Sequence, residues 1–128
     1  MKRLLLILVL ATALTGCHPP SGQAWVRSEI YFGQTKPSGA HITPTDWQTF
    51  LDEVVTPQFP AGLTLFDAAG QWRNATGHID RERSKVLVLV HRSGNEIERQ
   101  IDDIRATYCR RFEQEAVLKV TSKASVAF

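Results

Sequence analysis

Two segments of the chain carry apolar residues at helical spacing, and each lies between segments with the pattern of a β-strand. The first apolar stripe follows the spacing i, i+3, i+4, i+7 and consists of Trp47, Phe50, Leu51 and Val54. The second stripe also repeats at helical spacing and consists of Ile97, Ile101, Ile104, Tyr108 and Phe112. A helix with one apolar face has to bury that face against other elements. The two segments are therefore expected to be helices packed on a sheet.

Strand patterns occur in four segments of the chain, at residues 25–33, 63–73, 85–91 and 117–120. The first of them alternates, so that Ile30 and Phe32 share one face and polar residues occupy the other. Residues 85–91 are apolar and β-branched almost throughout, which is typical of a central strand. Residues 74–82 are polar and contain a glycine, which predicts a turn.

The resulting order is β-α-β-β-α-β, which is the split β-α-β or ferredoxin-like arrangement. We therefore expect an α+β fold, with a four-stranded antiparallel sheet and both helices on one of its faces. A single domain over residues 25–120 accounts for all of these elements, and residues 121–128 would form a tail of undefined order. The other sheet face would be free for a ligand, a partner or a second subunit.

Both predicted helices begin at a recognisable capping sequence. Thr43 and Asp46 have the spacing of a capping box, and Pro44 suits the first helical position. Ser93 and Glu96 have the same spacing ahead of the second helix. Each pair marks the residue at which a helix should start.

The N-terminus has the layout of a secretory signal, with a basic start at Lys2 and Arg3 and an apolar run over residues 4–14. This run is too short to span a bilayer, which needs about 20 residues. The sequence Leu14-Thr15-Gly16-Cys17 follows it and resembles the lipobox of bacterial lipoproteins. That resemblance implies that residues 1–16 are a signal peptide that is cut away, and that Cys17 receives a diacylglycerol and an acylated amine.

Residues 17–24 are rich in proline, serine and glycine, and they should form an extended tether between the lipid and the domain. His18 stands where enteric lipoproteins that stay in the inner membrane have an aspartate. The resemblance to lipoproteins therefore implies an exported protein that is lipid-anchored to the outer membrane, in a host that has one, and that faces the periplasm.

Charge and cysteine content limit the partners of the mature chain. The formal net charge of +2 comes from Lys2 and Arg3, so the chain after the signal is balanced and no nucleic-acid partner is expected. Cys109 is then a lone thiol, expected to pack as a small apolar residue of a helix. No pair of histidines has the spacing of a helical metal site, and we expect neither a metal nor a cofactor.

One constellation of polar residues could carry chemistry on the free sheet face. The alternation of the first strand turns Arg27, Glu29 and Tyr31 away from the helices. Neighbouring strands could add further groups, which gives the candidate catalytic residues Glu29, Tyr31 and His91. The candidate binding residues are Arg27, Gln71, Trp72 and Lys85. A carboxylate, a phenol and an imidazole could perform acid–base chemistry, whereas the alternative is a polar face with cross-strand ion pairs.

Several sequence segments resemble those of a bacterial family of secreted proteins, the domain-of-unknown-function family 3574. These segments are Glu29–Gly33, Trp47–Leu51, Val55–Thr64, Asp67–Trp72, Ser84–Lys85 and Phe112–Leu118. The resemblance implies one compact exported domain, and it carries no catalytic residue.

Three functions remain open on the sequence alone. The first is a lipid-anchored binding or interaction module of the cell envelope, in contact with a second copy or an envelope protein through the free sheet face. The second is a small acid–base enzyme of the isomerase or monooxygenase type with its site on that face. The third is a purely structural envelope protein. A pocket around Glu29, Tyr31 and His91 would favour the enzyme, and a flat apolar face would favour interaction.

Overall fold

The computed structural model describes residues 24–73 and 75–128. The signal peptide expected over residues 1–16, Cys17 and the tether up to residue 23 lie outside the described residues. The described elements are, in chain order, β1 (Trp25–Gly33), α1 (Pro44–Phe50), the π-helical segment η1 (Leu51–Val55), β2 (Thr64–Arg73), β3 (Ile79–Arg92), α2 (Asn95–Phe112) and β4 (Leu118–Lys123).

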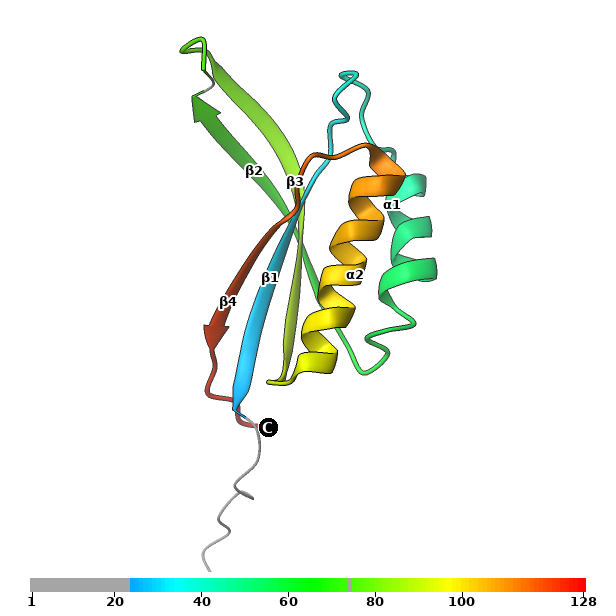
Figure 1. The fold of residues 1–128 in the computed structure, drawn as a ribbon, viewed down its shortest axis with the longest axis vertical. Coiled ribbons are helices and arrows are strands. Elements are labelled where there is room, and N and C mark those ends of the chain that lie inside the picture. Colours follow the sequence, from blue (N-terminus) through cyan, green and yellow to red (C-terminus); the bar gives the residue numbers. More distant parts are fainter. Residues whose placement is uncertain (1–23, 74) are drawn as a thin grey trace, which may run out of the picture.

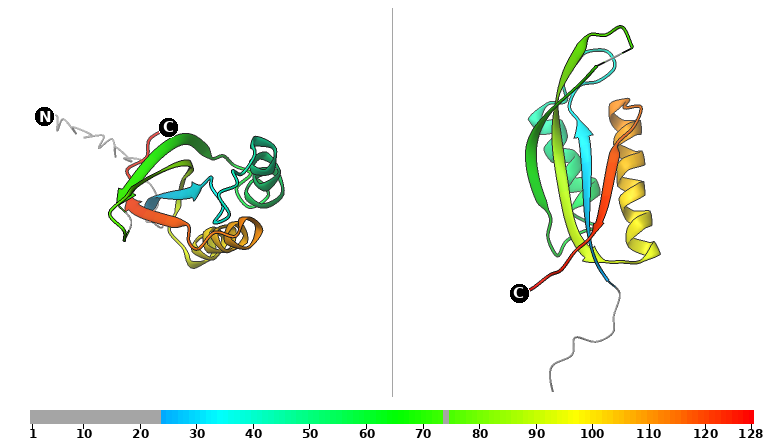
Figure 2. Two further views of the ribbon diagram at one scale, coloured as in Figure 1. Left: turned by 90° about the horizontal axis from the view of Figure 1, so that it is seen from above. Right: turned by 90° about the vertical axis from the view of Figure 1, so that its left-hand side faces the viewer.

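The four strands form one sheet in the order β2-β3-β1-β4, and every neighbouring pair is antiparallel. Both helices lie on the same face of this sheet, and no helix or strand of the described residues covers the other face (Figure 1 and Figure 2). The predicted α+β, ferredoxin-like fold is therefore confirmed. We call the uncovered side of the sheet the open face.

The first helix begins as its capping residues predict. The Thr43 hydroxyl accepts a hydrogen bond from the Asp46 backbone N–H at 3.1 Å, and the Asp46 carboxylate accepts one from the Thr43 N–H at 3.2 Å. Pro44 occupies the first turn, where its missing N–H costs nothing. After Phe50 the chain continues as one π-helical turn to Val55.

The second helix begins differently from the prediction, because Ser93 does not cap it. Gly94 is the N-cap and provides no side-chain hydrogen bond. The Ser93 backbone N–H donates instead to the Ala24 carbonyl at 2.8 Å, so Ser93 still belongs to the end of the sheet. The helix therefore starts one residue later than the capping pattern suggested.

Aromatic rings fill the space between the sheet and the helices. Phe32 of β1 is fully buried, and its ring centroid lies 4.7 Å from that of Tyr108 and 5.3 Å from that of Trp47. Phe50 and Phe112 extend the same cluster, so both predicted stripes face the core. Cys109 is half-buried against this core, as expected for a cysteine that packs as a small apolar residue of a helix.

The third strand is longer than the sequence pattern indicated, because part of the predicted turn over 74–82 is strand. Residues 79–83 pair with residues 69–73 and have no other strand beside them, since β1 ends at the pair Gly33–Ser84. We call this two-stranded extension the ribbon. It projects beyond the rest of the sheet (Figure 1). Four of the five residues 79–83 are charged, and this composition resembles a loop.

Both ends of the described domain lie at the end of the sheet opposite to the ribbon. β4 extends to Lys123, beyond the expected Val120. The Ala124 N–H then donates to the Trp25 carbonyl at 2.9 Å, and the Phe128 ring lies 6.2 Å from the Trp25 ring. The C-terminal residues therefore lie beside the start of β1 (Figure 1).

Candidate functional site

Three of the predicted site residues meet on the open face. Arg27, Glu29 and Tyr31 alternate along β1 with the buried residues of the helix side. The Arg27 Nε atom donates to Glu29 Oε1 at 2.7 Å, and the Tyr31 hydroxyl donates to Glu29 Oε2 at 2.6 Å. One carboxylate is thus held between a guanidinium and a phenol.

This arrangement fixes the protonation state of its members. The hydrogen bonds from Tyr31 and then Arg27 lower the pKa of Glu29, because both donors stabilise the ionised carboxylate. The same bond to Glu29 raises the pKa of Tyr31, because the phenol would lose it on ionisation. Both pKa values move away from neutrality, whereas a proton-transfer group works best near the operating pH. Both shifts favour an ionised Glu29 beside a neutral Tyr31.

His91 and Lys85 do not join this cluster, because both lie on the helix side of the sheet. His91 is directly opposite Val26 and is 8% exposed, and its Nε2 atom lies 2.9 Å from the hydroxyl of the buried Ser28. Lys85 is opposite Phe32 and forms an ion pair with Asp67. Side chains directly opposite each other share a face, so the expected convergence of Glu29, Tyr31 and His91 is not formed.

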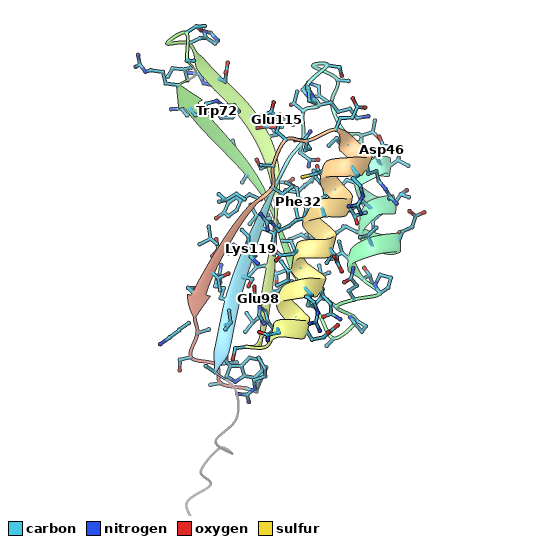
Figure 3. All side chains as sticks on the ribbon, in the orientation of Figure 1. Phe32, Asp46, Trp72, Glu98, Glu115 and Lys119 are labelled. Carbon is cyan, nitrogen blue, oxygen red and sulfur yellow. The ribbon has the colours of Figure 1, made fainter. Side chains whose placement is uncertain are left out.

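Gln71 and Trp72 are also separate from the cluster, because both belong to the ribbon. Trp72 is opposite Asp80, whereas Tyr31 is opposite Val86. Six residues of strand separate these two positions, a distance of roughly 20 Å. Figure 3 shows Trp72 on the projecting part of the hairpin, far from the helices.

Large exposed apolar side chains from β2, β3 and β4 lie on the open face, on both sides of the polar residues of β1. One row runs across all four strands through successive cross-strand partners, namely Phe66, Val86, Tyr31 and Leu118. The adjacent row consists of Thr64, Val88, Glu29 and Val120. Phe66 is 53% exposed, Leu118 59% and Val120 45%, and Val90 of the next row is 48% exposed. The side chains of β2 and β4 were not assigned to this face from the sequence. The alternation of Leu118 and Val120 with the lysine between them was the available signal.

Replacing Tyr31 by phenylalanine should raise the pKa of Glu29 towards its ordinary value, because one of its two donors is lost. In the folded wild type the lowered pKa contributes stability above the unfolded-state pKa, and this contribution disappears as the pH falls through the folded-state pKa. The titration of the Glu29 carboxyl carbon by ¹³C NMR measures the change directly. An unchanged titration curve in the variant would show that the phenol does not stabilise the carboxylate in solution.

Within residues 24–73 and 75–128, no group of three or more histidine, cysteine, aspartate or glutamate side chains is placed to hold a metal ion. None of the helices in this part of the chain is long and apolar enough to cross a membrane.

The sheet, its helices and the open face define a ferredoxin-like α+β domain with an uncovered apolar sheet surface. The chain belongs to the family described as "Protein of unknown function (DUF3574)", whose model matches residues 27–128. This confirms the family resemblance of the sequence. No curated protein is detectably similar to the chain in sequence.

Solved structures with this fold include a phage SAM lyase and the protein CutA. The phage SAM lyase in complex with S-methyl-5'-thioadenosine has a TM-score of 0.60 and 14% identity, over 80% of this chain and 83% of the lyase chain. Its apo state has a TM-score of 0.56 and 15% identity, over 85% and 87% of the two chains. CutA from Synechococcus elongatus, complexed with Bis-Tris, has a TM-score of 0.51 and 13% identity, over 80% and 83%. At these identities the likeness shows a common fold alone.

Proposed function

We propose that the protein is a lipid-anchored, periplasm-facing interaction module whose open face binds a second copy of the chain. The observation that carries this proposal is the group of exposed apolar side chains on that face, Phe66, Val90, Leu118 and Val120. Contiguous exposed apolar patches on soluble domains usually mark interaction surfaces.

The charge of the open face favours a second copy over a charged partner. Arg27 and Glu29 form an ion pair within the face, so their charges cancel. A suitable partner surface is therefore apolar and carries no net charge. A second copy has this property by construction, and a two-fold contact places the same patch on both subunits.

The size of the open face is of the order that a stable dimer needs. Four strands spaced about 4.8 Å apart, with a mean length of roughly 25 Å outside the ribbon, cover on the order of 500 Å² in projection. Protruding side chains make the accessible surface larger than the projection. Stable interfaces bury about 800 Å² per partner, so most of the face would be covered in the dimer.

A lipid anchor would favour this association. The tether leads into Trp25, and the ribbon lies at the opposite end of the sheet (Figure 1). An anchor at Cys17 would therefore leave the open face accessible between the membrane and the ribbon. Copies confined to one membrane surface have a high effective concentration, which strengthens a weak contact.

The geometry supports the interaction module better than the alternative hypothesis of an acid–base enzyme. His91 lies on the other side of the sheet, and the pKa values of Glu29 and Tyr31 are shifted away from neutrality. The likeness to a phage SAM lyase concerns the fold, and the open face lacks the three converging groups on which the enzymatic hypothesis rested.

Sedimentation equilibrium of a soluble chain of residues 18–128 tests the proposed association. We expect the mean mass to rise from monomer to dimer as the protein concentration increases into the micromolar range. A monomer at every concentration up to millimolar would contradict binding between copies. A stable complex with an envelope protein on the same face, with the chain itself monomeric, would assign the face to that other partner.

Lipidation at Cys17 is tested by mass spectrometry of the protein purified from its own membrane. We expect an N-terminal peptide that starts at Cys17 and carries a diacylglycerol and an acyl chain, because the four-residue lipobox is complete. The three acyl chains of this modification exceed the two membrane-binding signals that stable anchoring needs. An intact Met1 or an unmodified Cys17 would contradict the anchor.

A further inference from the structure

The ribbon and the loop after β1 enclose a cleft on the helix side of the sheet. The cleft has a volume of about 930 Å³ and lies between β2 and β3 on one side and residues 34–44 on the other. A second hollow of about 590 Å³ continues it along the ribbon, since both are lined by His41, Ala69 and Arg83. Small-molecule sites in proteins typically measure about 300–1,000 Å³. We call the two hollows together the ribbon cleft.

Basic side chains line the ribbon cleft at alternate positions of β3. Arg81, Arg83 and Lys85 share one face of the strand, with neighbours about 7 Å apart. Lys85 is neutralised by its ion pair with Asp67. Glu82 also lines the cleft, but Arg81 and Arg83 form no ion pair or side-chain hydrogen bond with it or with any other side chain in the described part of the chain. Two guanidinium groups are therefore left to bind an anion.

Small and apolar residues keep the ribbon cleft open beside these guanidinium groups. Ala69 is directly opposite Arg83 in the ribbon, and Gly70 follows it. On the other side, Ile42 and Pro44 form an apolar wall. A ligand that fits must therefore combine an anionic group with a compact apolar part.

The inner end of the ribbon cleft is held rigid by Gln34. This side chain is 9% exposed, and its amide nitrogen donates to the Phe32 carbonyl at 3.0 Å and to the Tyr108 hydroxyl at 2.9 Å. Tyr108 in turn donates to the Gly33 carbonyl at 2.7 Å. These bonds fix the position of the loop relative to the sheet, so the cleft is formed before a ligand arrives.

We infer that the ribbon cleft binds a small organic phosphate monoester. Its phosphate would lie between Arg81 and Arg83, and its organic group would lie against Ile42 and Pro44. A phosphate monoester carries up to two negative charges, which match two unpaired guanidinium groups, and its oxygens suit the fork geometry of arginine. This site goes beyond the proposed function, because it lies on the opposite side of the sheet from the open face.

Isothermal titration calorimetry with phenyl phosphate tests this inference on the full-length protein in a non-ionic detergent. We expect saturable binding of phenyl phosphate, with inorganic phosphate and phenol each at least tenfold weaker because each lacks one half of the ligand. Arg83→Ala should weaken phenyl phosphate binding at least tenfold. Arg99→Ala removes the same charge from an exposed position of α2 and should leave binding unchanged.

Two further variants test whether phenyl phosphate binds in the ribbon cleft and not on the open face. Ala69→Trp should abolish binding by filling the ribbon cleft, with an unchanged circular dichroism spectrum as evidence of folding. Phe66→Lys should bind phenyl phosphate like the wild type, because Phe66 lies on the open face. Absence of binding to the wild type at millimolar phenyl phosphate, equal losses in Arg83→Ala and Arg99→Ala, or undiminished binding in Ala69→Trp would each overturn the inference.

Discussion

Replacing Trp47 by alanine is expected to lower the free energy of unfolding by about 3–5 kcal/mol. Trp47 is 5% exposed, and its ring centroid lies 5.3 Å from that of Phe32, 5.9 Å from Phe50 and 6.1 Å from Tyr108. Its removal leaves a cavity among rings that are themselves fixed by the sheet and α2. Urea denaturation of residues 18–128, followed by circular dichroism, measures this loss.

Thr49→Ala provides the matched control for the core prediction. Thr49 is exposed on the same short helix, so its replacement should change the free energy of unfolding by less than about 0.5 kcal/mol. A loss of under about 1 kcal/mol in Trp47→Ala would mean that the indole does not fill the core in solution.

Replacing Phe66 by lysine is expected to weaken self-association of the domain at least a hundredfold. Phe66 is 53% exposed and begins the apolar row that crosses the open face. Burying a phenylalanine contributes roughly 1.5–3 kcal/mol, and a two-fold dimer loses this contribution twice. Each 1.4 kcal/mol corresponds to about a tenfold change in the dissociation constant. Sedimentation equilibrium of the variant and the wild type gives the two constants.

Thr49→Lys adds the same positive charge on the helix side and should leave the dissociation constant of the dimer unchanged. The free energy of unfolding of the Phe66→Lys monomer should also remain close to that of the wild-type monomer, because the side chain is not part of the core. Equal weakening of association by both variants would point to charge repulsion between copies and not to the open face.

The helices and the fold class could be predicted from sequence because their signals are local. Trp47 and Phe50 on the first helix and Tyr108 and Phe112 on the second lie at helical spacing, and all four are buried. The Thr43 capping box depends only on residues within one turn. Ser93 is not the cap, and its backbone N–H donates to the carbonyl of Ala24, a residue distant in sequence that a local pattern does not reveal.

The candidate site was predicted only in part, because strand register is not a local property. The alternation of β1 correctly turned Glu29 and Tyr31 to the open face. The strand at 85–91 is apolar on both faces, so its sequence does not reveal which alternate residues face the helices. Pairing with Val26 decides this for His91 and places it on the buried side.

The β3 half of the ribbon was not predicted, for a different reason, whereas residues 69–73 lie within the strand expected over 63–73. Residues 80–83 are all charged, and such a run resembles a loop. The pairing of Arg83 with Ala69 becomes apparent only once the hairpin register is known. The cleft beside it follows from that register and from the position of the loop after β1.

The contact between two open faces is tested most directly by isotope-filtered NMR on a mixture of ¹³C-labelled and unlabelled chains of residues 18–128. We predict intermolecular NOEs that join the Phe66 and Tyr31 rings to the methyl groups of Val90, Leu118 and Val120. These side chains all belong to the open face, so their contacts across two molecules require the faces to meet. Intermolecular NOEs confined to residues of α1 and α2, or none at millimolar concentration, would contradict the account.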